Sequence, residues 1–106
     1  MTSNSLLAGT RISNADATPY INNRINFIGS NFYGVIQSPD HKPIDFRNYG
    51  YLDTLLIAEL NKDEPSFIIY SYNTPIAWFG KVGWVIPSVK YSSTTSRHQS
   101  IVRRAI

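Results

Sequence analysis

A histidine among hydroxyl side chains is the group in this sequence closest to a catalytic arrangement. His98 lies in a segment rich in serine and threonine, residues 92–100. Nucleophilic catalysis needs a serine or threonine beside a histidine that a carboxylate orients. No acidic residue lies between Lys81 and Ile106, so the carboxylate would have to come from 40–64. In the structural alternative, Ser96 caps a helix and His98 lies on its buried face. We favour this alternative and expect no enzymatic activity.

The residue types in this sequence give little support for a metal site or a cofactor site. The chain has no cysteine, which excludes disulfides and thiolate metal sites. Its acids and histidines lack the close spacing of a metal-ligand set, and no glycine-rich phosphate-binding motif occurs. We therefore expect no cofactor and no metal.

Charge is distributed unevenly along the chain. The formal net charge is +3, and six of the seven acids fall in 40–64. The segment 81–106 is purely basic, with Lys81, Lys90, Arg97, Arg103 and Arg104. This basic region is a candidate surface for an acidic protein partner or for nucleic-acid phosphate. The alternative is an ordinary solvated helix face.

Two tyrosines form a second candidate binding surface. Alternation along a strand would place Tyr70 and Tyr72 on one face, opposite Ile69. If that face is exposed, it is a partner-binding platform, because tyrosine anchors interfaces well. The alternative is that the C-terminal helix covers it.

The elements that position these residues are predicted to be mostly strands. Tyrosine, phenylalanine and tryptophan are plentiful, which favours strands over helices. Strands are expected at 32–37, 42–46, 66–72, 74–79, 84–86 and 89–91. Residues 52–60 fit both a helical stripe and a strand face. We favour a strand at 54–60, because a hairpin across the turn 61–65 is the simplest arrangement.

The ends of the chain differ from this pattern. Residues 1–31 are rich in Ser, Thr and Asn and are predicted to be an irregular N-terminal arm. The arm either packs across the domain as a loop or reaches a partner, and we expect it to contribute to outside contacts more than to folding. Ser96 and Gln99 form a capping box, and His98, Ile101, Val102 and Ala105 then follow a helical stripe. The expected fold is α+β: a small antiparallel β-meander with a short C-terminal helix and the irregular arm. The domain proper would span 32–106.

Two segments of the chain resemble a known family. They are Tyr70-Ser71-Tyr72-Asn73-Thr74-Pro75-Ile76-Ala77 and, after Trp84, Tyr91-Ser92-Ser93-Thr94-Thr95-Ser96-Arg97-His98-Gln99. Together they resemble small uncharacterised proteins of bacteriophages and prophages, over residues 66–102. The resemblance implies a phage accessory protein that binds a host or phage protein, with inhibitors of host defence such as anti-CRISPR proteins as one instance.

The sequence therefore leads us to expect a binding protein that acts by occupying a protein partner. The alternatives are a nucleic-acid-binding module that uses the basic C-terminal region and a structural protein that self-associates through its arm and strand edges. No apolar run reaches the ~18–20 residues of a membrane helix. The N-terminus lacks the pattern of a signal peptide. We expect no membrane contact and a location in the cytoplasm of a bacterial host.

Overall fold

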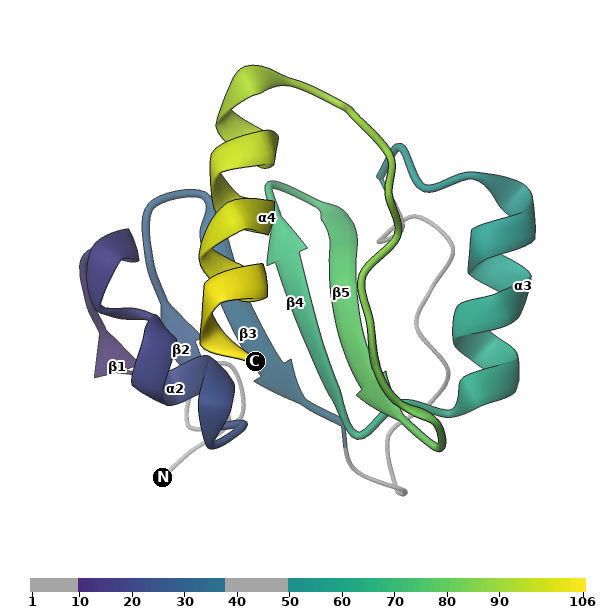
Figure 1. The fold of residues 1–106 in the computed structure, drawn as a ribbon, viewed down its shortest axis with the longest axis horizontal. Coiled ribbons are helices and arrows are strands. Elements are labelled where there is room, and N and C mark those ends of the chain that lie inside the picture. Colours follow the sequence, from purple (N-terminus) through teal and green to yellow (C-terminus); the bar gives the residue numbers. More distant parts are fainter. Residues whose placement is uncertain (1–9, 38–49) are drawn as a thin grey trace, which may run out of the picture.

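A mixed sheet organises the part of the chain that the computed structural model describes, residues 10–37 and 50–106 (Figure 1). Within these residues six strands form one sheet whose spatial order follows the chain. The strands are β1 (Thr10–Arg11), β2 (Phe27–Ile28), β3 (Phe32–Ile36), β4 (Phe67–Ser71), β5 (Thr74–Gly80) and β6 (Gly83–Val85). β1 pairs with β2 in parallel, and the other neighbours are antiparallel. The expected α+β class with an antiparallel meander is confirmed.

The hairpin of β4 and β5 lies in the middle of the sheet. Every residue of β4 is buried, because helices cover both faces. Phe67 and Ile69 belong to one core, while Ile68 and Tyr70 belong to the other. The pairing of β4 with β5 shifts register between Ile69 and Tyr70. This central hairpin therefore separates two hydrophobic layers.

The first layer lies under the C-terminal helix α4 (Ser93–Ala105), beside the short helix α2 (Thr18–Asn22) (Figure 1). α4 contributes Val102 and Ala105 to this core, and α2 contributes Ile21. Ala17 and Phe27 are also buried here, and the 3-10 turn η1 (Asn14–Asp16) leads into α2.

The prediction that the N-terminal arm, residues 1–31, contributes to outside contacts rather than to the core is wrong for its described part. Few apolar residues occur there, but Ala17, Ile21 and Phe27 are all at most 1% exposed. Residues 1–9 lie outside the described residues.

The second layer lies under helix α3 (Thr54–Asp63). Leu60 packs there with Ile68 and Trp78. The predicted strand at 54–60 is therefore wrong. The Asp53 carboxylate accepts a hydrogen bond from the Leu55 N–H at 2.7 Å and caps the helix, which ends at Glu64 in a left-handed conformation of φ 48°. β3 takes the place beside β4 that a 54–60 strand would need.

α4 begins one turn earlier than its sequence pattern predicts. The Ser92 hydroxyl accepts from the Thr95 N–H at 3.1 Å, so Ser92 is the cap and the predicted capping role of Ser96 is wrong. Gln99 donates to the carbonyl of Val89 at 3.1 Å instead of reaching back to Ser96. The predicted buried stripe is confirmed for His98, Val102 and Ala105. The predicted strand at 89–91 is wrong, since these residues form an irregular connection that leads into α4, and the Gln99 side chain donates to the carbonyl of Val89 within it. The expected strand at 42–46 lies outside the described residues.

Candidate binding site

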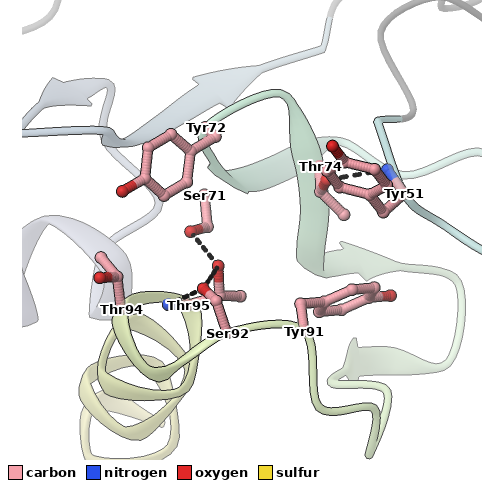
Figure 2. A pocket seen from close by; sticks show the side chains of 8 residues that line it. All are labelled: Tyr51, Ser71, Tyr72, Thr74, Tyr91, Ser92, Thr94 and Thr95. Atoms are coloured by element: carbon pink, nitrogen blue, oxygen red, sulfur yellow. Dashed lines mark hydrogen bonds between the residues drawn. The ribbon is translucent and has the colours of Figure 1, made fainter.

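A hollow of about 380 Å³ opens where the β4–β5 turn meets the start of α4 (Figure 2). Pockets of this size are typical of small-ligand sites. Its wall consists of tyrosines, serines and threonines and carries no ionised group at neutral pH. The lining residues are Tyr51, Ser71, Tyr72, Thr74, Tyr91, Ser92, Thr94 and Thr95.

Three segments that are distant in the sequence build this pocket. The hairpin end supplies Ser71, Tyr72 and Thr74, and the start of α4 supplies Ser92, Thr94 and Thr95. Tyr51 is tied to the hairpin because its backbone N–H donates to Thr74 Oγ1 at 3.0 Å. Gly50 makes this approach feasible: its φ is +56°, and a Cβ there would collide with the Thr74 hydroxyl.

A buried hydrogen-bond chain supports the floor of the pocket. His98 is 2% exposed and stacks on Phe32, with the ring centroids 4.5 Å apart. Its Nδ1 lies 2.7 Å from Ser71 Oγ, and Ser71 Oγ lies 2.9 Å from Thr95 Oγ1. On the other side of the ring, His98 Nε2 lies 3.3 Å from Asn14 Nδ2. The chain therefore runs from η1 through α4 to β4.

The orientation of the Asn14 amide sets the histidine tautomer. Asn14 Oδ1 accepts from the Ser30 N–H at 2.8 Å, so the Nδ2 group is the one that faces His98. Because Nδ2 can only donate, Nε2 must accept and the ring proton must be on Nδ1. Nδ1 then donates to Ser71 Oγ. Burial lowers the pKa of His98, which favours this neutral form.

This proton arrangement favours a structural role for His98. A histidine that activates a serine must accept the serine proton. Here the Nδ1–H donates to Ser71, and Asn14 occupies the other nitrogen. Ser71 is therefore held in place by this histidine and is not activated by it. Among the described residues, no group of three His, Cys, Asp or Glu side chains could hold a metal ion.

The predicted basic residues are exposed but differ in their surroundings. Arg97, Arg103 and Arg104 lie on the outer side of α4, and no ion pair involves them within the described ranges. Lys90 is exposed in the irregular segment before α4. Lys81 lies 2.7 Å from Glu64, whose hydrogen bond and charge raise the pKa of Lys81. Lys81 is thus already partnered, whereas the three arginines of α4 have no ion pair with another described residue.

The two predicted tyrosines do not share a face. Tyr70 is 7% exposed in the α3 layer and stacks on Tyr33, with ring centroids 5.0 Å apart. The candidate partner-binding role that depends on an exposed face is therefore excluded for Tyr70, and the residue is covered by α3 rather than by the C-terminal helix. Tyr72 follows the end of β4 with a φ of +57° and is 48% exposed at the pocket rim. The left-handed turn takes it out of the strand alternation.

One family model accounts for most of the chain. The model of a family of unknown function, DUF8033, matches residues 15–102. The chain belongs to this family. No curated protein and no solved structure matches it significantly. None of the helices in the described ranges is long and apolar enough to cross a membrane.

The DUF8033 match spans every residue of the pocket. Among the lining residues, the sequence predicted a partner-binding role for Tyr72 alone, and it placed Ser92, Thr94 and Thr95 only in the hydroxyl-rich segment around His98. A signal for the others was present, because the segments 70–77 and 91–99, which carry the phage-protein resemblance, supply all the lining residues except Tyr51. What the sequence does not show is that the two segments meet. Tyr51 has no signal beyond its position after Gly50.

Proposed function

We propose that this DUF8033 chain is a binding protein that occupies an acidic surface of a protein partner through the outer face of α4. The observation that carries the proposal is a set of exposed arginines on α4, which form no ion pair within residues 10–37 and 50–106, on a helix whose opposite side is anchored. Arg97 and Arg104 are seven residues apart and therefore share one face of the helix. Val102 and Ala105 fix the buried side in the core.

Exposed arginines of this kind contribute more to binding than to folding. Isolated surface charges stabilise a fold by about 0–1 kcal/mol. An arginine guanidinium, however, binds a carboxylate through two parallel hydrogen bonds. Following the resemblance to phage accessory proteins, the expected partner is a bacterial host protein or a phage protein, with a host defence component such as a CRISPR-Cas protein as one instance.

A matched pair of charge-reversal variants tests this proposal. Arg97→Glu/Arg104→Glu changes the charge of the α4 face, while Arg11→Glu/Lys62→Glu makes the same change in net charge at other exposed positions. Wild type and control should capture the same protein from a nuclease-treated bacterial lysate after crosslinking, and the α4 variant should lose it. Equal capture by all three folded proteins would refute a partner surface on α4.

The same exposed arginines favour one second candidate, binding of nucleic-acid phosphate. Three phosphate contacts predict a log–log dependence of the affinity on salt with a slope of about −3 for duplex DNA. A gel shift at increasing salt separates the two candidates. Steep, sequence-independent binding to duplex DNA that the α4 variant loses would establish the second candidate and exclude the first.

A further inference from the structure

The pocket floor presents hydroxyl protons that have no acceptor within the described part of the chain. Ser92 donates to Thr95 Oγ1 at 3.2 Å, and one hydrogen bond joins Thr95 to Ser71. Ser71 already accepts from His98 Nδ1, as the Asn14 orientation requires. Whichever of Ser71 and Thr95 donates to the other, the second of them keeps an O–H without an acceptor. Both side chains are at most 4% exposed.

Thr74 adds a second donor of the same kind. Its Oγ1 accepts the Tyr51 N–H at 3.0 Å, which leaves its own O–H proton without a partner inside the described ranges. Thr74 is 4% exposed. Buried donors need acceptors, so a ligand that displaces solvent from this pocket must bring acceptor atoms to replace it. The floor thus selects for oxygen or nitrogen acceptors.

Aromatic rings lie on either side of these hydroxyl donors. In Figure 2 the ring of Tyr72 lies on one side of the Ser71–Thr95 bond, and the rings of Tyr51 and Tyr91 lie toward the other side. Tyr51 is 85% exposed and Tyr72 is 48% exposed, so both have ring surface that is free to stack on a planar ligand.

The electrostatics of the lining favours an uncharged ligand. None of the lining side chains is ionised at neutral pH, and burial followed by the Asp53 charge raises the pKa of the Tyr91 phenol. A charged group placed here would lose hydration without a counter-charge in the wall. The occupant should therefore be planar, neutral and rich in acceptors along its edge.

We propose that this pocket binds a nucleobase, stacked on the tyrosine rim, with its carbonyl oxygens accepting from Thr74 and from the Ser71–Thr95 pair. A nucleobase is planar, uncharged at neutral pH and carries acceptors on its edge. The site is separate from the partner surface on α4 and does not depend on it. The base can belong to a free nucleoside or to single-stranded nucleic acid, which is read by stacking on aromatic side chains.

An NMR titration of the full chain tests the proposal. Uridine, with two ring carbonyls, should shift the backbone amide signals of Ser71, Thr74 and Thr95, while ribose 5-phosphate, which lacks the base, should not. Oligouridine distinguishes the two sources: tighter binding than uridine at the same amides indicates a single strand, and equal or weaker binding indicates the free nucleoside. Shifts from ribose 5-phosphate equal to those from uridine, or no shift at these amides with either compound, would overturn the proposal.

Variants provide a second arm of this experiment. Tyr72→Ala should weaken uridine binding about tenfold, because stacking of one base on an aromatic ring contributes on that order. Tyr72→Phe keeps the ring and should bind like wild type. Thr95→Val should also weaken binding, with Thr18→Val, an exposed threonine in α2, as the control. Because Thr95 also serves the internal hydrogen-bond chain, Tyr72→Ala decides the result if Thr95→Val does not fold. Unchanged uridine affinity in Tyr72→Ala would refute the stacking site.

Discussion

A single side-chain amide, that of Asn14, determines how protons are arranged across the interior. Its oxygen accepts from Ser30, so its nitrogen must donate to His98, and His98 Nδ1 must then donate to Ser71. The hydrogen bond between Asn14 and His98 also connects the segment before α2 with α4, although the two residues are 84 positions apart in the sequence. One polar contact thus links the start of the described fold with its end.

The stability of the fold should depend on pH through His98. Burial lowers the pKa of His98 in the folded state, so the unfolded chain takes up a proton first as the pH falls. The stabilisation should be complete above about pH 6.5 and should fall below that value by up to about 1.4 kcal/mol per pH unit. Protonation also places a donor on Nε2 against the donor of Asn14.

Urea denaturation at pH 7.5, 6 and 5 measures this effect as a change in the free energy of unfolding. The control is His98→Gln, which lacks the titratable ring and should show a smaller loss over the same pH interval. If the two proteins lose the same amount of stability between pH 7.5 and pH 5, the buried histidine is not the cause of the pH dependence.

At the scale of single elements, α3 illustrates how a local cap decides between two patterns. Leu56 and Leu60 fit a helical stripe and a strand face equally well. Asp53 caps the helix from its N-terminal side, and the left-handed Glu64 ends it before Pro65. The helix then covers the face of β4 and β5 that carries Ile68 and Trp78.

Two leucines of α3 give a direct test of this arrangement. Leu60 is 1% exposed, whereas Leu55 is 79% exposed. Leu60→Ala should lower the free energy of unfolding by about 2–5 kcal/mol, because it opens a cavity above the sheet. Leu55→Ala should change it by no more than about 0.5 kcal/mol. Guanidinium denaturation of both variants checks the result, and similar losses in the two would contradict the burial pattern of α3.

At the scale of the whole molecule, two helical layers enclose the central hairpin, and the sequence segment before residue 32 completes one of them. Ile21 and Phe27 lie in the same core as Val102 and Ala105. Asn22 Nδ2 also donates to the carbonyl of Ala105 at 2.8 Å. The first layer, under α4, therefore depends on residues from both ends of the described chain.

A fragment of residues 32–106 should accordingly fail to fold cooperatively. It lacks Ala17, Ile21 and Phe27, whose removal exposes the apolar side of α4 to water. Thermal unfolding followed by circular dichroism, with the full chain as the reference, measures the loss. A sharp transition near that of the full chain would show that the predicted domain boundary at residue 32 is correct after all.

The sequence alone determined the features that depend on neighbouring residues. The alternation at 66–72 predicted β4, and the 3.6-residue spacing of His98, Val102 and Ala105 predicted which side of α4 is buried. The basic composition of 81–106 likewise predicted exposed arginines on that helix. These properties are local, since the period of a strand or helix is set by its own backbone.

Only the tertiary structure decided the rest. Whether 54–60 pairs with β4 or packs over it depends on β3, which occupies the place beside β4. Tyr70 and Tyr72 separate because a left-handed turn begins at the end of β4, which strand alternation cannot foresee. The pocket exists because the sheet brings the hairpin end against the start of α4, although Ser71 and Thr95 are 24 positions apart. Contacts at such separations follow from how the layers pack, and no local pattern in the sequence encodes them.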